Sequence, residues 1–492
     1  MGAKSAYKGL VALAAAQTAS AGLLDSGIFK FFDTVTRDVV IVGGGAAGSH
    51  AAIRLKEDHG KSVVLIERED ILGGHVDTYY DPKANGAVRE YGVQCYFPYE
   101  DAMDFIDRFN LTVAPGLGPR GATTPKYVDF QSGKELNGYV PPDFGAQIGG
   151  IVEFYNVLTS KGYDKMVEPG FWNLPTGPNI PEDLLLPIGE FAKKYNVSTA
   201  LPRMYESTGG GPASQQDDFL NIMTLTFLQS FSPSWMKVFF TDIGYYHIEG
   251  GNQQLYNKIA ARLGNDVMTN TVVLMSERTS TGVTLLVSGL KGTKIIKAKK
   301  LLMAIPPTRE NLVPFDLNAE ETAIFAKPKY GRYGTALVSH PSLPKGTDLM
   351  NLPASAVADP WSPFLDLPHI LSFSSYGNDT DLFSIGTSGN PYLLYGQLAS
   401  TGVAQVALQK MALQGTIPAL KGKLIEVVEW SDHGPGGFGV TAQDMRNGWM
   451  DKMYGLQGKR STWYTGNAIA IDFSTTLWKM NDEVIKRMLA SW

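Results

Sequence analysis

One stretch constrains the fold of this chain more than any other, and it runs from Asp38 to Thr78. A buried strand is predicted over Val39–Val42, the glycine-rich turn Gly43–Gly48 follows it, and a helical pattern comes next. The turn reads G-x-G-x-x-G, which binds a dinucleotide when it lies between a strand and a helix. The stretch therefore predicts an α/β fold built on a Rossmann-type domain.

Each glycine of the turn has its own physical role. Gly43 lets the strand turn tightly, Gly45 lets a pyrophosphate approach the backbone, and Gly48 lets the helix pack closely on the strand. The phosphates would then lie at the helix N-terminus, close to the N–H groups of Ala46 and Ala47. A glycine-rich turn in some other kind of α/β unit is the alternative interpretation.

An acidic residue follows where a ribose would be bound. The second β-branched run, Val63–Ile66, ends in Glu67, about 20 residues after Gly48. A carboxylate at this position disfavours the extra phosphate of NADP and leaves NAD and FAD open. Arg68 comes next and is a further candidate cofactor contact.

A second glycine pair distinguishes the two remaining cofactors. The segment Leu72–Thr78 contains Gly73 and Gly74, followed by His75. This segment resembles the signature of the flavin amine-oxidase superfamily, in which the pair runs beside the pyrophosphate and the flavin of FAD. The resemblance implies FAD, with Gly73 and Gly74 at the cofactor, while His75 either contacts FAD or packs.

Later segments match the same superfamily in order along the chain: 86–94, 248–273 with 301–307, and 461–489. The first resembles a strand near the flavin, with Gly92 at the closest approach. The second resembles a segment whose valine backbone, here Val272, meets the adenine. The third resembles a closing strand, a glycine, here Gly466, and a helix whose N-terminus faces the flavin.

Within the superfamily, the chain resembles the fungal beta-cyclopiazonate dehydrogenase family. The form Gly-Gly-His-Val-Asp-Thr, the strand Tyr91–Val93 and an export-like leader carry this resemblance. It implies an FAD enzyme of secondary metabolism that moves a hydride from a small apolar metabolite to flavin N5, with desaturation or ring closure. An electron acceptor, oxygen or another, is also implied. A related branch of FAD-dependent double-bond isomerases is an alternative.

The chain departs from amine oxidases at two positions. They usually have Gly-Gly-Arg where this chain has His75, and many place a lysine beside N5. The matching strand here, Arg332–Val338, has no lysine, and Lys327 and Lys329 lie upstream. An amine or amino-acid oxidase, with Arg332 as a possible substrate anchor, is therefore a second hypothesis. A third, non-catalytic hypothesis is a flavoprotein that has lost turnover and serves as a binding or structural protein.

Two aromatic residues are candidates for the flavin-facing wall. In amine oxidases an aromatic pair flanks the substrate, and Trp463, Tyr464 and Trp478 lie in the matching region. Alternation along a strand would bury one of the first two. Tyr464 and Trp478 are therefore the candidate catalytic residues.

The resemblance predicts a Rossmann-type FAD-binding domain interleaved with an α+β substrate domain. The FAD-binding domain would comprise residues 36–120, 245–307 and 431–492, and the substrate domain residues 121–244 and 308–430. Helical segments rich in Tyr, Phe, Leu and Met occupy much of 140–240. They suit either an apolar substrate pocket or a second hydrophobic core.

The N-terminus predicts export. Lys4 and Lys8 precede a short apolar run and a small-residue cleavage site, so residues 1–21 are interpreted as a signal peptide that is too short to span a membrane. A disordered leader or a mitochondrial presequence is the alternative. Glycosylation sequons agree with the secretory pathway; they begin at Asn110, Asn196 and Asn378.

Charge and cysteine content exclude several other classes. A net charge of −5 over 492 residues gives no electrostatic reason to expect nucleic acid or an anionic membrane as a partner. Cys95 is the single cysteine, so an intrachain disulfide is excluded. A cysteine-based metal site is also disfavoured, and no metal is expected.

Overall fold

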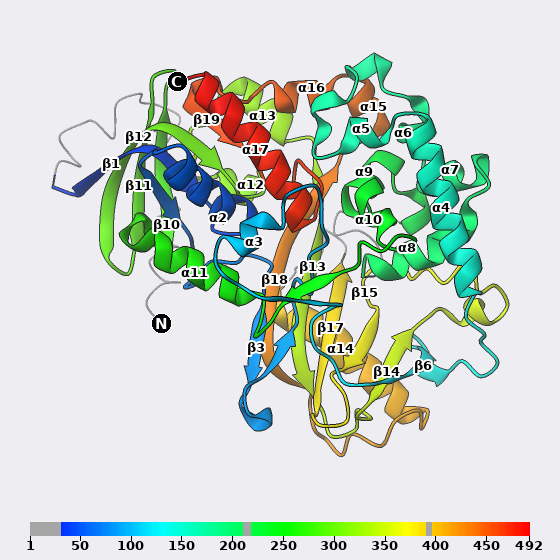
Figure 1. Cartoon of the computed structure of the whole chain (residues 1–492). Helices are drawn as coiled ribbons and strands as arrows, with labels where there is room; N and C mark the ends of the chain where they lie inside the picture. The colour runs from blue at the N-terminus through cyan, green and yellow to red at the C-terminus, as the bar shows by residue number, and fades with distance from the viewer. Residues whose placement is uncertain (1–30, 210–217, 390–395) are drawn as a thin grey trace.

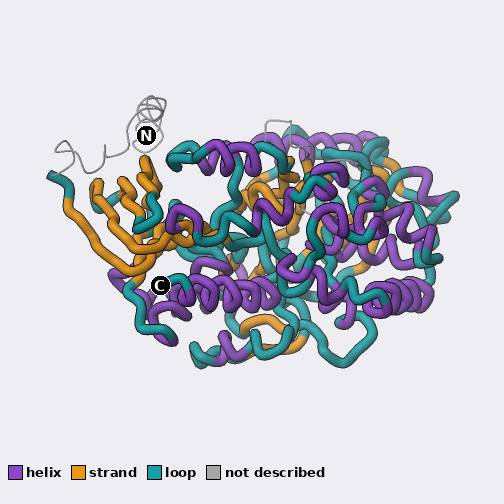
Figure 2. Tube along the Cα trace, turned by 90° about the horizontal axis from the view of Figure 1, so that it is seen from above, coloured by secondary structure: helices purple, strands orange, loops and turns teal. Residues whose placement is uncertain are grey.

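The computed structural model describes residues 31–209, 218–389 and 396–492. The predicted signal peptide, residues 1–21, lies outside the described residues. Two large sheets and a layer of helices make up the described part (Figure 1). Figure 2 shows one group of strands at one end of the molecule, with helices and further strands along the rest of it.

The first sheet has seven strands drawn from three distant parts of the chain. Its core is parallel, with β12 beside β1 and β1 beside β2, and its β10–β11–β12 edge is antiparallel. Strands buried on both faces read as continuous Val, Ile and Leu runs, as β1 and β2 do. The order is β10 (Thr271–Arg278), β11 (Val283–Gly289), β12 (Gly292–Met303), β1 (Asp33–Val42), β2 (Val63–Ile66) and β9 (Val267–Met268), with β19 (Thr462–Tyr464) paired to β12.

Three helices pack together on this sheet. Figure 1 shows α2 (Ala46–Ile53) between α17 (Ser474–Ala490) and α11 (Gln253–Leu263), and both helices contact α2. The small residues of α2 are buried, including Ala47 and Ala51. The helix thus lies close to its neighbours, and its N-terminus is held at the end of β1.

The second sheet has eight strands and is covered by α14 (Gln397–Leu413), which contacts β15 and β18. It combines strands from both segments predicted for the substrate domain. The order is β18 (Glu426–Gly439), β13 (Lys329–Ser339), β17 (Leu382–Gly389), β16 (Ser372–Ser375), β14 (Thr347–Asn351), β6 (Thr124–Asp129) and β7 (Lys134–Glu135), with β15 (His369–Ile370) paired to β17.

One predicted boundary differs from the structure. The C-terminal FAD-binding segment was expected to begin at residue 431, but β18 runs from Glu426 to Gly439 and pairs with β13 throughout. The run Gly434–Gly437, with its proline, disguises the strand, because such residues are typical of loops. The second sheet therefore extends further along the chain than the sequence indicates.

The remaining elements are short strand pairs and the helical layer. The strand pairs are β3 (Thr78–Asp81) with β4 (Ala87–Glu90), and β5 (Val113–Pro115) with β8 (Tyr246–Ile248). The helices are α3 (Asp104–Asp107), α4 (Phe144–Ser160), α5 (Asp164–Val167), α6 (Glu182–Leu185), α7 (Ile188–Lys194), α8 (Leu201–Ser207), α9 (Thr224–Ser230), α10 (Pro233–Lys237), α12 (Arg309–Leu312), α13 (Ala319–Phe325), α15 (Ala442–Arg446) and α16 (Trp449–Tyr454).

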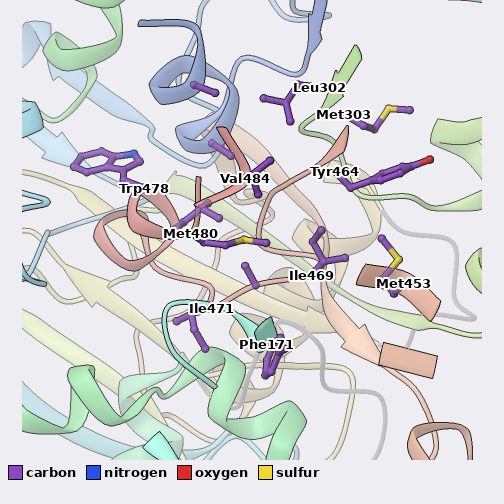
Figure 3. Close-up of a cluster of buried hydrophobic side chains, with 14 of the residues drawn as sticks. Phe171, Leu302, Met303, Met453, Tyr464, Ile469, Ile471, Trp478, Met480 and Val484 are labelled. Carbon is purple, nitrogen blue, oxygen red and sulfur yellow. The ribbon is translucent and has the colours of Figure 1, made fainter. Parts of the chain in front are cut away.

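A large apolar core joins the first sheet to the helices. Figure 3 shows part of it, with Leu302 and Met303 of β12, Met453 of α16, and Met480 and Val484 of α17. All five side chains are buried. Among the described residues, no helix combines the length and apolar character that crossing a membrane requires.

Candidate functional site

The glycine-rich turn between β1 and α2 leaves no room for side chains at two positions. Gly43 has φ +106°, and a Cβ atom there would lie 2.7 Å from the carbonyl oxygen of Ala304. A Cβ atom on Gly48 would lie only 1.9 Å from the carbonyl oxygen of Gly43. The helix therefore packs directly on the end of the strand, and only glycine permits this approach.

The first turn of α2 is available to an anion. Gly45 is the N-cap residue, no side chain caps the helix, and its first turn carries no acidic residue. Uncapped N–H groups at a helix N-terminus attract negative charge, and the helix dipole adds to the effect. Ala46 and Ala47 begin this turn, where the sequence places the pyrophosphate.

A second glycine segment faces the first. Gly73 and Gly74 have φ values of +141° and +61°, and Gly73 forms a parallel bridge with Gly45. A Cβ atom on Gly74 would lie 2.9 Å from the Cα atom of Gly45. At Gly92 a Cβ atom would lie 2.2 Å from the carbonyl oxygen of His75. We call Gly45, Gly73, Gly74 and Gly92 together the glycine cradle.

Glu67 is fixed beside the cradle by backbone donors. Its Oε2 accepts a hydrogen bond from the N–H of Gly44 at 2.6 Å, and its Oε1 accepts one from the N–H of Glu69 at 2.9 Å. The N–H of Thr271 donates a hydrogen bond to the carbonyl oxygen of Glu67 at 2.8 Å. The next residue along the chain is Val272, which is thereby held near Glu67. The exposed Arg68 forms an ion pair with Glu69.

The C-terminal segment reaches the same turn. Gly466 has φ +115°, and a Cβ atom there would lie 3.8 Å from the Ala304 carbonyl oxygen that also abuts Gly43. α17 begins shortly afterwards, and no side chain caps it at Phe473. The uncapped helices, facing glycine segments and anchored acid fit a bound dinucleotide with a pyrophosphate at α2 and a ribose at Glu67.

The structure places the two aromatic candidates elsewhere. The ring of Trp478 is 1% exposed and packs with His50, Tyr96 and Phe105. The hydroxyl of Tyr464 donates to Glu321 at 2.9 Å within a buried charged cluster. Both side chains thus belong to the protein interior seen in Figure 3.

The charged cluster around Tyr464 joins the C-terminal segment to β10 and α13. Arg278 forms ion pairs with Asp316 at 2.9 Å and with Glu321 at 2.8 Å, and Arg460 pairs with both acids. Burial alone would raise the pKa of Glu321, but the hydrogen bond and charge of Arg278 outweigh it and lower that pKa. Strand alternation cannot reveal such a cluster, because both faces of β19 are buried.

A histidine that the sequence did not single out lies at the cradle. His433 of β18 stacks on His75, with ring centroids 4.5 Å apart and ring planes 7° apart. Its Nε2 lies 2.7 Å from Oδ2 of Asp77. Burial, followed by the charges of His433 and Arg68, lowers the pKa of His75 to about 3, so this imidazole is neutral near pH 7.

Glu90, at the end of β4 near Gly92, has a perturbed pKa. Burial raises the pKa of its carboxyl to about 7, although hydrogen bonds from the N–H of Asn252 and the hydroxyl of Thr78 oppose the shift. The folded protein therefore binds one proton more than the unfolded chain between pH 4.5 and about 7. Its stability must fall as the pH rises through this window.

Glu90→Gln is expected to remove this loss of stability. Relative to the wild type, the variant should gain about 1–3 kcal/mol of unfolding free energy between pH 5 and pH 8, because the amide does not ionise. Urea unfolding of both proteins across this pH range measures the difference. Parallel pH profiles for the two proteins would contradict the assignment.

A Rossmann sheet interleaved with a second sheet, together with a glycine cradle for a dinucleotide, defines a flavin amine-oxidase-like fold. Residues 41–109 match the family described as an NAD(P)-binding Rossmann-like domain. Among solved structures, the fold resembles a CLA-producing fatty acid isomerase from P. acnes (TM-score 0.70, 18% identity, 92% of this chain and 98% of that one). It also resembles putrescine oxidase (TM-score 0.60, 17% identity, covering 93% of this chain and 100% of that one).

Curated relatives then identify the family. The chain is 31% identical to the beta-cyclopiazonate dehydrogenase of Aspergillus flavus, over 93% of this chain and 94% of that protein. It is 33% identical to the FAD-dependent oxidoreductase dbaF of Emericella nidulans, over 93% of this chain and 92% of that protein. The chain belongs to this family of fungal FAD-dependent oxidoreductases. The predicted family, fold class and FAD cofactor are confirmed.

Proposed function

We propose that this protein oxidises a small apolar metabolite of secondary metabolism by hydride transfer to FAD, with desaturation or oxidative ring closure of the product. The names of the relatives support the redox class. The observation that carries the substrate class is a group of aromatic side chains beside the start of α17. We call Phe97, Phe231, Trp235 and Phe473 the aromatic wall.

The aromatic wall connects the predicted substrate segment with the C-terminal helix. Phe473 lies 4.3 Å from Phe97 and 5.5 Å from Trp235 between ring centroids, and Phe231 lies 4.7 Å from Trp235. The indole N–H of Trp235 donates to the hydroxyl of Tyr245 at 2.8 Å, which fixes the indole. Phe97 and Phe231 are buried, and Trp235 and Phe473 are partly exposed, so the second pair would be the surface that favours an apolar, ring-containing substrate over a charged one.

The chain's own residues supply binding and orientation. The glycine cradle and the N-terminus of α2 would hold the pyrophosphate, and Glu67 would hold the ribose. The aromatic wall would exclude water from the reacting carbon. The chemistry supplied by bound FAD is acceptance of the hydride and later transfer of the two electrons to oxygen or another acceptor.

The lysine positions weigh against amine oxidation. β13 begins at Lys329, so this lysine opens the strand rather than lying upstream as expected, and it is exposed. Lys327 forms an ion pair with Asp444 at 3.0 Å. The rest of β13, residues 330–339, contains no lysine. An amine oxidase that needs a lysine from this strand is therefore the less favoured hypothesis.

An absorption spectrum tests the proposal first. The purified protein is expected to show the two bands of bound flavin, and anaerobic addition of an apolar aromatic metabolite should bleach them. The product should be two hydrogens lighter than the substrate by mass spectrometry. A product of unchanged mass would identify an isomerase, and peroxide formation with simple amines an amine oxidase. A protein that stays colourless with added FAD would overturn the proposal.

We also propose that the protein enters the secretory pathway. The leader over residues 1–21 and the three sequons support this, and the side chains of Asn110, Asn196 and Asn378 are exposed. Expression in a fungal host followed by glycosidase treatment and mass spectrometry tests it. An intact N-terminus and an unchanged mass would contradict it.

A further inference from the structure

The geometry points to His433 as the base that takes up the proton released when the substrate is oxidised, with Asp77 as its positioning partner. This inference rests on the proposed function, because a desaturation or ring closure removes a proton as well as a hydride. His433 comes from β18 of the second sheet and Asp77 from the segment after the glycine pair.

The contact with Asp77 indicates which nitrogen of His433 is free to act. Nε2 lies 2.7 Å from Oδ2 of Asp77, and an ionised carboxylate can only accept a hydrogen bond. Nε2 must therefore carry the hydrogen, which leaves the lone pair on Nδ1. Among residues 31–209, 218–389 and 396–492, no side chain or backbone group is found hydrogen-bonded to Nδ1, although Thr335 Oγ1 lies 3.4 Å from Nε2.

The position of His433 matches the role. Its ring stacks on His75, the residue after Gly74, and the cradle residue Gly92 abuts both the His75 carbonyl and the Asp77 carboxylate. The side chain of His433 is only 10% exposed. A residue of the substrate sheet thus reaches the cradle, where the cofactor-binding and substrate-binding parts of the chain meet.

The neighbours of His433 suit a base. Burial keeps His75 neutral, so it presents no charge to the His433 ring, and Oδ2 of Asp77 lies 2.7 Å from Nε2. The titratable and charged groups around the pair come from several elements: Asp77, His75, Arg68, Glu90, Tyr333, Glu429 and Asp472.

The atoms and electrons of the step balance. One substrate C–H bond breaks, and its electron pair leaves with the hydrogen as a hydride to FAD. A second hydrogen leaves as a proton, from a neighbouring C–H in desaturation or from the nucleophilic group in ring closure. Its bonding pair forms the new double bond or ring bond. The proton goes to Nδ1 of His433 and then to solvent.

Three variants test the inference on the full-length FAD-loaded protein. His433→Gln keeps a donor for Asp77 but has no base, and should slow anaerobic flavin bleaching by about 10²–10⁴-fold. His433→Ala should regain rate when free imidazole is added. The control is His340→Gln, which changes a buried histidine directly after β13 that accepts a hydrogen bond from the N–H of Ser342, and it should leave the rate unchanged.

A readout without substrate separates this inference from the proposed function. In ¹⁵N-histidine NMR of the wild type at neutral pH, one imidazole should show a protonated Nε2 and an unprotonated Nδ1, and this signal should vanish in His433→Gln. The reverse tautomer would overturn the inference whatever the substrate. Bleaching by the wild type with an unaffected His433→Gln would overturn it while leaving the proposed function standing. If His433→Ala lost the bleaching rate and free imidazole did not restore it, His433 would have a structural role and the inference would be overturned.

Discussion

Gly48→Ala is expected to weaken FAD binding strongly and to destabilise the fold. The added methyl group would lie 1.9 Å from the Gly43 carbonyl oxygen, so α2 would have to move away from β1. Overpacking of this kind typically costs about 1–3 kcal/mol, and here it also displaces the helix N-terminus that receives the pyrophosphate. Affinity for FAD should fall about 100-fold or more, measured by equilibrium dialysis with thermal unfolding in parallel.

Two other helical glycines serve as matched controls. Gly149 of α4 and Gly402 of α14 are exposed, and an added Cβ atom at either would meet no atom within 4 Å. Alanine at these positions should be neutral or stabilise by about 0.5–1 kcal/mol, because glycine weakens a helix. Wild-type FAD affinity in Gly48→Ala would show that the turn does not hold the cofactor.

Glu321→Ala is expected to produce the largest loss of stability among single charge deletions. Its carboxylate is buried, pairs with Arg278 and Arg460, accepts from Tyr464 and completes the capping box of α13 with Asn318. Removing one partner of a buried ion pair costs about 3–5 kcal/mol, because a charge is left uncompensated. Urea unfolding at pH 7 measures the change.

The neighbouring Glu320 provides the control. It pairs with Lys459 at 2.7 Å, but both side chains are about half exposed. Such a surface pair contributes about 0–1 kcal/mol, so Glu320→Ala should be nearly silent. The lowered pKa of Glu321 adds a pH signature, since its contribution is present above the pKa of an unfolded glutamate and is lost as the pH falls through the folded value. Equal effects of the two substitutions would contradict the importance of the cluster.

The cofactor half of the molecule could be predicted because its signals are local. Gly43, Gly48 and Glu67 lie within one βαβ unit. Gly48 abuts the carbonyl oxygen of Gly43 in the same turn, and Glu67 accepts a hydrogen bond from the N–H of Gly44. Contacts of this kind can be predicted from residues that lie close together in the sequence.

The contacts between distant parts of the chain could not be predicted in the same way. His433 and Asp77 are 356 residues apart, and only the pairing of β18 with β13 brings them together. The partners of Tyr464 likewise come from β10 and α13. Alternation of apolar and polar residues along a strand predicts which face is buried. The prediction fails for β19 because both of its faces are buried.

The first sheet is completed by a strand that lies far along the chain, and this has a consequence for synthesis of the protein. Its last strand, Thr462–Tyr464, pairs with residues 301–303, and the helix after it packs on α2 near the start of the chain. Contacts of such long sequence separation form late and slowly. Until residues 462–490 have been synthesised, the edge of β12 at residues 301–303 has no partner strand there and the nascent chain lacks the helix that covers α2. Cofactor capture is thus coupled to synthesis of this late segment, which makes the partly synthesised protein a natural client for chaperones.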